Sequence, residues 1–76
     1  MENEGFKGWT NRATWNVSHW LNNDEHLYSL AQSLKLVDAA QFENLCRYVW
    51  KETTPDGDEL DNVDWQEIAE SWRIQK

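Results

Sequence analysis

The chain has 76 residues, of which 39% are hydrophobic and 28% are charged, and its formal net charge at pH 7 is −7. Six Trp, two Tyr and two Phe residues supply large side chains for a core, so the composition predicts one folded domain over residues 1–76 and excludes a disordered chain. We find no apolar stretch long enough to span a membrane, no signal-peptide pattern and only one cysteine, which predicts a cytoplasmic protein without membrane contacts, disulfides or a zinc ribbon.

The first predicted helix follows a polar lead-in. Residues 1–7 are mostly polar and predict an N-terminal arm, and residues 8–76 are expected to form a helical core. Thr10 or Asn11 can begin a helix, because a side-chain oxygen at this position accepts a hydrogen bond from a free backbone N–H. Helical spacing then places four apolar residues on one face: Ala13, Val17, Trp20 and Leu21.

Two further helices are predicted before residue 53. Asn22-Asn23-Asp24 interrupts the first pattern and can cap a second helix. Its apolar face contains Leu27, Leu30, Ala31 and Leu34. Asp38 and Gln41 have the spacing of a capping box, and Val37 and Phe42 have that of a hydrophobic staple, so they predict the start of a third helix. Its apolar face contains Phe42, Leu45, Cys46 and Val49.

A fourth helix is predicted to begin with the same combination of capping box and hydrophobic staple. The turn-forming residues 53–58 end the third helix. Asp64 precedes Glu67 by three residues, and Val63 and Ile68 are placed to form a staple. The apolar face contains Trp65, Ile68, Ala69 and Trp72. No segment alternates with period two, so the sequence predicts an all-α protein, a compact bundle of four short helices that depend on mutual packing.

The negative charge is concentrated in one segment. Residues 52–70 contain eight acidic residues and no Lys or Arg, whereas the rest of the chain has six acidic and seven basic residues. The segment includes a predicted acidic loop at 53–63. Such a surface repels phosphate, which disfavours direct nucleic-acid binding, and attracts a basic protein surface. Alternatively, the segment only keeps a small protein soluble.

Metal binding and catalysis receive little support. His19 and His26 are seven residues apart, whereas two ligands on one helix face would be three or four apart. A calcium-loop register that starts at Asp56 fails because Leu60 occupies a ligand position and Asp61 replaces the required Gly. The sequence therefore predicts no metal site and no cofactor.

An enzymatic role is not expected either. Cys46 lies on the apolar face of the third predicted helix and is interpreted as a core residue, because a catalytic thiol needs a base and an electropositive setting. Paired carboxylates act as acid and base only in a cleft that perturbs their pKa values, and four short helices leave little room for one. The three glycines form no phosphate-binding loop.

Trp15 does not fit the first apolar face. At 100° per residue, it projects about 160° away from that face. One interpretation is that Trp15 packs under the N-terminal lead-in, against Phe6 or Trp9. A second is an exposed aromatic anchor for a protein partner, because Trp is enriched among the residues that dominate binding energy. Stacking on a nucleic-acid base is a third use, which the negative net charge disfavours.

The first third of the chain contains three short runs of aromatic and polar residues: Gly8-Trp9-Thr10-Asn11, Thr14-Trp15-Asn16-Val17 and Trp20-Leu21-Asn22-Asn23-Asp24-Glu25. Their spacing is similar to the recurrent signature GWTN-x-x-TW-x-V-x-x-WL-x-ND. Through it, residues 8–28 resemble a family of small proteins found in phages, plasmids and other mobile elements. The resemblance brings no catalytic residue. It implies a context, since small mobile-element proteins often counter host defence, and anti-CRISPR proteins are among them.

The sequence thus predicts an anti-CRISPR-like inhibitor that binds a basic nucleic-acid-binding surface of a host defence protein or complex, as a monomer or weak homo-oligomer. The residues expected to contact this partner are Asp56, Asp58, Glu59, Asp61, Glu67, Glu70 and Trp15. The alternative is a helical interaction or regulatory module that self-associates through exposed Trp residues and uses its acidic segment only for solubility.

Overall fold

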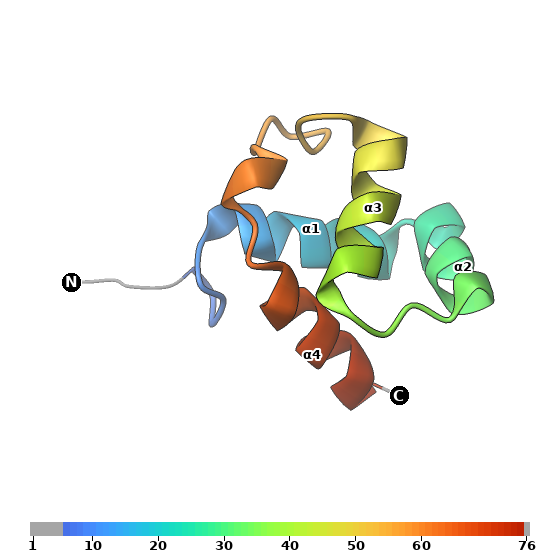
Figure 1. Ribbon diagram of the computed structural model, residues 1–76. Coiled ribbons are helices and arrows are strands. Elements are labelled where there is room, and N and C mark those ends of the chain that lie inside the picture. The colour runs from blue at the N-terminus through green and yellow to red at the C-terminus, as the bar shows by residue number, and fades with distance from the viewer. Residues whose placement is uncertain (1–5, 76) are drawn as a thin grey trace.

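Within residues 6–75, which the computed structural model describes, the chain forms four α-helices and one short 3-10 helix (Figure 1). The elements are α1 (Arg12–Asn23), α2 (Glu25–Leu34), α3 (Ala39–Trp50), η1 (Leu60–Asn62) and α4 (Trp65–Gln75). In this range β-type pairing is limited to two isolated bridges. The predicted all-α bundle of four short helices is therefore confirmed.

The helices pack around α1, which runs behind α3 in Figure 1. α1 contacts α2 on one side and α4 on the other, and α3 packs against α4. The segment from the end of α3 through η1 passes over one end of the bundle and leads into α4 (Figure 1). This route places the acidic loop next to the N-terminal half of α1.

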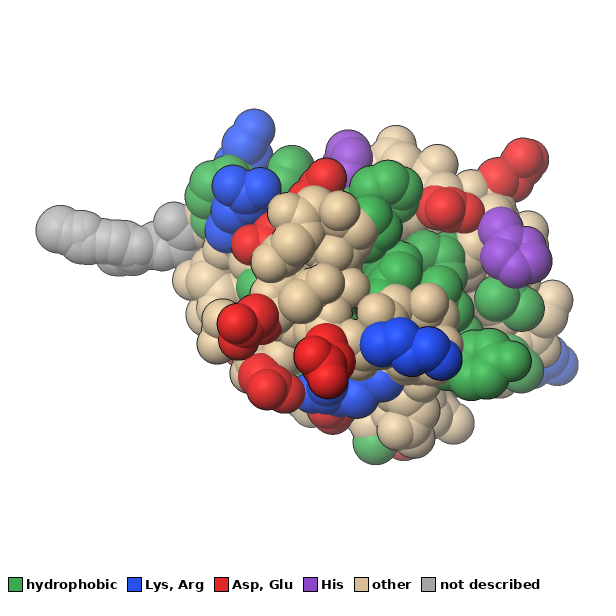
Figure 2. All heavy atoms as spheres, turned by 90° about the horizontal axis from the view of Figure 1, so that it is seen from above, with side chains coloured by type: hydrophobic (Ala, Val, Ile, Leu, Met, Phe, Trp, Pro, Cys, Tyr) green, Lys and Arg blue, Asp and Glu red, His purple; other side chains and the backbone are tan. Residues whose placement is uncertain are grey.

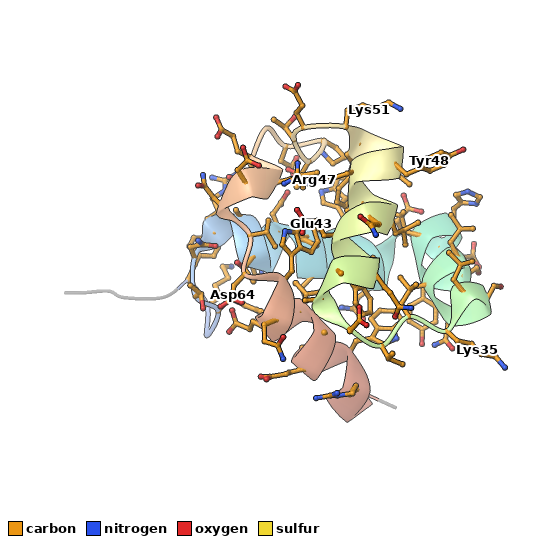
Figure 3. The ribbon with its side chains drawn as sticks, viewed as in Figure 1. Lys35, Glu43, Arg47, Tyr48, Lys51 and Asp64 are labelled. Carbon is orange, nitrogen blue, oxygen red and sulfur yellow. The ribbon has the colours of Figure 1, made fainter. Side chains whose placement is uncertain are left out.

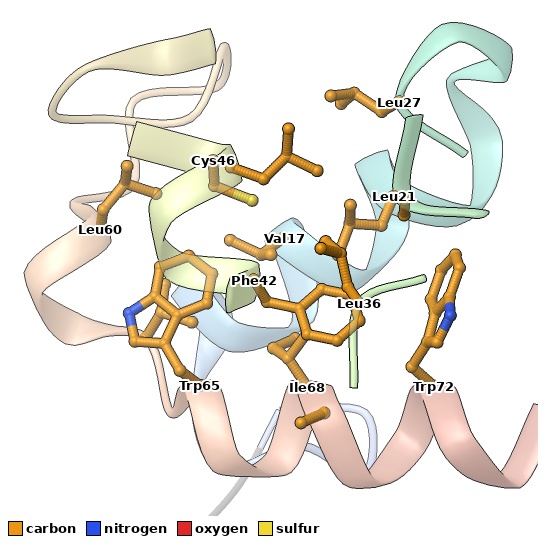
Figure 4. Close-up of a cluster of buried hydrophobic side chains, with 14 of the residues drawn as sticks. Val17, Leu21, Leu27, Leu36, Phe42, Cys46, Leu60, Trp65, Ile68 and Trp72 are labelled. Carbon is orange, nitrogen blue, oxygen red and sulfur yellow. The ribbon is translucent and has the colours of Figure 1, made fainter. Parts of the chain in front are cut away.

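The core lies between α1, α3 and α4 (Figure 4). Phe42, Val17 and Cys46 are 0% exposed, and Phe42 packs against Trp72 with 5.6 Å between the ring centroids. The whole predicted apolar face of α4 is buried: Trp65, Ile68, Ala69 and Trp72. Burial raises the pKa of the Cys46 thiol to about 12, so this cysteine is a neutral core residue, as predicted.

The predicted helix starts at α1, α2 and α3 are confirmed. Asn11, not Thr10, caps α1, because its Oδ1 accepts a hydrogen bond from Thr14 N. Asp24 caps α2 by accepting from two backbone N–H groups. At α3 the capping box is complete: Asp38 Oδ1 accepts from Gln41 N, and Gln41 Oε1 accepts from Asp38 N.

Two apolar residues are more exposed than the sequence predicted. Leu34 of α2 is 56% exposed and Val49 of α3 is 37% exposed, so the prediction that these side chains are buried is wrong. Val37, which was predicted to form a staple, is 49% exposed. Helical spacing identifies an apolar face, but it does not show how far the neighbouring helices cover that face.

The chain reverses direction in two unusual turns. Lys7 and Gly8 both have positive φ, as in a type I′ turn, and Phe6 and Trp9 exchange two backbone hydrogen bonds across it. Lys51, at the end of α3, has φ 74° and ψ −84°, and Glu52 N donates to the carbonyl oxygen two residues earlier. This is a γ-turn, a strained conformation that turns the chain sharply from α3 into the acidic loop.

Candidate acidic interface

The acidic loop between α3 and η1 is closed by its own backbone. Gly57 N donates to Thr54 O at 2.9 Å, and Thr54 N donates to Asp58 O at 2.8 Å. Pro55 and Gly57 suit this turn, since proline presets the first central residue and glycine adopts its positive φ of 93°. Leu60 follows the loop and is 0% exposed, so it anchors the segment in the core.

Helix α1 holds the tip of this loop. Asn16 Nδ2 donates to Asp56 Oδ2 at 2.9 Å, and Trp20 Nε1 donates to the same oxygen at 3.1 Å. Asn16 is only 1% exposed, and its Oδ1 has no hydrogen-bond partner among the described residues. The hydrogen bonds from Asn16 and then from Trp20 lower the pKa of Asp56, with a smaller contribution from the positive charge of Arg12. One oxygen of Asp56 therefore accepts both hydrogen bonds that attach the loop to α1.

One carboxylate of the acidic loop, Asp58, and one of η1, Asp61, pair with arginines. Arg12 Nε lies 3.1 Å from Asp58 Oδ2, and the Asp58 side chain is only 20% exposed. Arg47 bridges two acids, with Nη2 at 2.8 Å from Asp61 and Nε at 2.8 Å from Glu43. The Asp61 side chain nevertheless remains 79% exposed. Asp58 thus mainly positions the loop, whereas Asp61 still presents its charge to solvent.

Three carboxylates line one surface depression. The depression has a volume of about 370 Å³ and is lined by Arg47, Glu52, Thr53, Glu59 and Asp61. We find no hydrogen bond to the Glu52 or Glu59 carboxylate from the described side chains or backbone. Figure 2 looks onto this end of the molecule and shows acidic side chains gathered on the side of the loop and η1, with Lys and Arg side chains among them. We call this depression the acidic site.

The start of α4 is held by α1 and not only by its own residues. Asp64 Oδ1 accepts from Glu67 N at 3.1 Å, as expected for a cap. Glu67, however, accepts from Thr10 N at 3.0 Å, and Asp64 N donates to Thr14 Oγ1 at 2.9 Å. The predicted hydrogen bond from Asp64 N to the Glu67 side chain is therefore wrong. Thr14 accepts the hydrogen bond from Asp64 N, and Thr10 N donates to Glu67, because both threonines lie close to the start of α4.

Glu67 and Glu70 face a different part of the surface. They line a separate depression of about 270 Å³ together with Gly8, Trp9 and Ser71. Glu70 also accepts a hydrogen bond from Gln66 Nε2 at 3.1 Å. The structure therefore brings Asp61 and Glu59 together, but it places Glu67 and Glu70 outside the acidic site.

Trp15 does not line the acidic site and is half-buried. Its ring centroid is 5.1 Å from that of Phe6 and 5.2 Å from that of His19, which stacks on it. Lys7 Nζ lies 5.4 Å from the Trp15 ring. The interpretation that Trp15 packs against Phe6 is confirmed, and two residues assigned to the N-terminal arm, Phe6 and Lys7, cover it.

Sequence reasoning missed the residues that position the acidic segment. Asn16, Thr14 and Arg12 were not singled out, although the first two lie on the stretch that matches the signature. The sequence did contain a signal for these residues. Polar residues with short side chains recur beside the apolar face of α1, whereas a helix that faces solvent there more often carries charged residues. In the structure, α1 bonds through Arg12, Thr14, Asn16 and Trp20 to Asp56, Asp58 and Asp64.

No group of three or more His, Cys, Asp or Glu side chains in the described part of the chain is arranged to hold a metal ion. None of the helices in residues 6–75 has both the length and the apolar character that crossing a bilayer requires. What the site offers is a set of exposed charges on a loop held by the bundle.

Comparison with known proteins gives a family without an assigned activity. No curated protein and no solved structure matches the chain. The sequence profile of DUF7249, a family of unknown function, covers residues 2–75, and the chain belongs to this family.

Proposed function

We propose that this protein is a small acidic inhibitor that binds a basic, nucleic-acid-binding surface of another protein through the acidic site. One observation carries the proposal: Glu52, Glu59 and Asp61 surround a single depression and expose their charges on a loop that the bundle holds in place. A preformed set of negative oxygens can occupy arginine and lysine side chains that otherwise bind phosphates.

The remaining carboxylates of the predicted interface have supporting roles in this proposal. Asp56 and Asp58 fix the loop through Asn16, Trp20 and Arg12, so they position the acidic site without forming its surface. Glu67 and Glu70 add negative charge at longer range. Trp15 is partly covered by Phe6 and does not line the acidic site, so it is a secondary contact in the proposal.

The biological setting we propose is anti-defence. The resemblance of residues 8–28 to small mobile-element proteins supports an anti-CRISPR-like role in the cytoplasm of a host cell, against a defence protein or complex with a basic surface. The protein would act by occupying that surface, without a cofactor, a metal or catalysis. A net charge of −7 disfavours both direct nucleic-acid binding and strong self-association.

The test is capture of basic partners from a host-cell lysate at low salt, followed by binding measurements with each purified partner. The variant Glu59→Lys, alone and with Glu52→Lys, reverses exposed charges of the acidic site. Glu25→Lys is the matched control, because Glu25 is an exposed residue of α2 outside the acidic segment. We expect duplex DNA to compete with the wild-type protein, higher salt to weaken binding, and the Glu59 variants but not the control to lose the partner.

Binding that resists salt, ignores DNA and survives both reversals would contradict the proposal. The alternative, a regulatory module whose acidic segment serves solubility, has one observation in its favour, an exposed apolar groove between α2 and α3. It predicts that the Glu52 and Glu59 reversals leave all interactions intact and reduce only the solubility of the protein.

A further inference from the structure

A second surface feature lies between α2 and α3, on the other side of α3 from the acidic site. It is a groove of about 470 Å³ lined by Leu30, Leu34, Leu36, Gln41, Asn44, Leu45 and Tyr48. No lining residue carries a charge. We call it the α2–α3 groove.

The groove exposes large apolar side chains. Leu34 on α2 is 56% exposed and Tyr48 on α3 is 78% exposed, although both lie at helical spacing from residues of the core. Figure 3 shows Tyr48 pointing outward from α3 on the side of α2. Isolated exposed apolar residues are common, but a continuous apolar groove with a polar border is typical of a protein-binding site.

Lysines stand at both ends of the groove. Lys35 ends α2 at one end, and Lys51 ends α3 at the other (Figure 3). Lys51 Nζ lies 5.8 Å from the Tyr48 ring and 3.4 Å from the Tyr48 carbonyl oxygen, so its charge sits at the border of the groove. Asp38 follows Lys35 by three residues, and its carboxylate caps α3 by accepting a hydrogen bond from Gln41 N at 3.0 Å. An otherwise acidic molecule thus has cations at the two ends of its apolar groove.

We propose that the α2–α3 groove binds an amphipathic helical segment of a partner protein, with apolar residues that enter the groove and Asp or Glu residues that meet Lys35 and Lys51. Helix-in-groove recognition places apolar anchors at spacings of three and four residues, and charges at the border select the partner. The partner chemistry is opposite to that of the acidic site, so this inference is independent of the proposed function.

A second copy of the chain is a poorer occupant. In a two-fold dimer through this groove, the same surface faces itself, so the lysines at its ends would meet lysines of the other copy. The two molecules, each with a net charge of −7, would also repel each other. An acidic-flanked segment from a different protein avoids the contact between like-charged lysines and places carboxylates beside Lys35 and Lys51 instead.

The experiment uses fluorescein-labelled peptides of about four helical turns and the full-length protein. The probe peptide carries Leu at positions i, i+3, i+4 and i+7 with Glu on the flanks. One control peptide has Lys in place of Glu, and another has Ser in place of Leu. Fluorescence anisotropy measures the affinity of each peptide.

Two kinds of variant identify the binding surface. Leu34→Ser and Tyr48→Ala remove apolar contacts at exposed positions, with Val49→Ser as the matched substitution outside the groove lining. Lys35→Glu with Lys51→Glu reverses the charges at the ends, with Arg73→Glu as a matched reversal on α4. Circular dichroism and thermal melting of each variant verify that it is folded.

We expect the Glu-flanked peptide to bind and the Ser peptide not to bind. Leu34→Ser or Tyr48→Ala should weaken the Glu-flanked peptide by about tenfold, which is the loss of about 1.4 kcal/mol. The double lysine reversal should favour the Lys-flanked peptide, and the two matched controls should change nothing. Failure of the Leu peptides to bind, equal binding of both flank types, or a homodimer that Leu34→Ser dissociates would overturn the inference. None of these results depends on the Glu52 and Glu59 variants, so the two proposals fail separately.

Discussion

Asp56 shows how a single carboxylate links the loop to the helix beneath it. Its Oδ2 accepts from Asn16 Nδ2 and from Trp20 Nε1, two groups that lie 40 and 36 residues earlier in the chain. Both donors favour the ionised form, which lowers the pKa of Asp56. The stability that this contact contributes is therefore present above the ordinary pKa of aspartate, about 3.9, and is lost as the pH falls through the lower folded-state pKa.

The pH dependence of unfolding tests this link. Asp56→Asn removes the titrating group and retains an oxygen that can accept a hydrogen bond. We expect the wild-type protein to be more stable than the variant near neutral pH, with a constant gap between their melting temperatures down to about pH 4, and we expect this gap to close as the pH falls from about 4 to about 2. Glu59→Gln is the control, since no described group donates to Glu59. A gap between wild type and Asp56→Asn that stays constant from about pH 4 to about pH 2 would show that the Asp56 charge does not stabilise the fold.

At the level of elements, α3 and α4 begin in different ways. The capping box of α3 is local, because Asp38 and Gln41 satisfy each other's backbone N–H groups. The start of α4 depends on α1: Thr14 Oγ1, 0% exposed, accepts from Asp64 N and donates to Asn11 Oδ1. Asn11 Nδ2 also donates to Asn62 O at 2.8 Å. The first turn of α1 therefore holds the end of η1 and the beginning of α4.

Thr14→Val measures what this connection contributes. Valine keeps the shape of threonine but leaves Asp64 N without its acceptor in a half-buried setting, so we expect a loss of about 1–3 kcal/mol in the free energy of unfolding by urea. Thr10→Val is the matched control. The Thr10 hydroxyl is exposed and lies 3.4 Å from Asp64 Oδ2, so its loss should change stability by less than about 0.5 kcal/mol. Equal effects of the two substitutions would argue against a special role for Thr14.

At the scale of the whole molecule, charge is distributed unevenly over the surface. The acidic site combines three carboxylates with one arginine, whereas the α2–α3 groove lies between two lysines. Arg12 and Arg47 each pair with a carboxylate of the acidic segment, which leaves a large negative excess. The repulsion within this excess opposes the compact state, and salt screens it over about 10 Å at 0.1 M.

The excess of negative charge predicts that salt stabilises the folded protein. The melting temperature of the wild-type protein should rise between about 0.01 M and about 0.15 M NaCl, because screening reduces the net repulsion. The variant with Glu52→Lys and Glu59→Lys has a smaller negative excess and should show a smaller rise. A fall in the melting temperature with salt would mean instead that attraction in the Arg12–Asp58 and Arg47–Asp61 pairs outweighs the repulsion.

Local interactions explain why much of this fold is readable from the sequence. The caps at Asn11, Asp24 and Asp38 act over two or three residues, so their spacing alone predicts them. The apolar face of α4 is equally local, because helical geometry places its residues on one side. The same reasoning overestimates the burial of Leu34 and Val49, since their exposure depends on neighbouring helices.

The sequence by itself determined the helices, most of their starting residues and the concentration of negative charge in residues 52–70. Only the tertiary structure decided which of those carboxylates bond to distant residues and which do not. Asp56, Asp58 and Glu67 bond to residues that are 36 to 57 positions distant in the chain, whereas Glu52 and Glu59 remain available at the surface. Contacts over such separations depend on how whole helices pack, and that packing follows from the shape of the entire core and not from any local pattern.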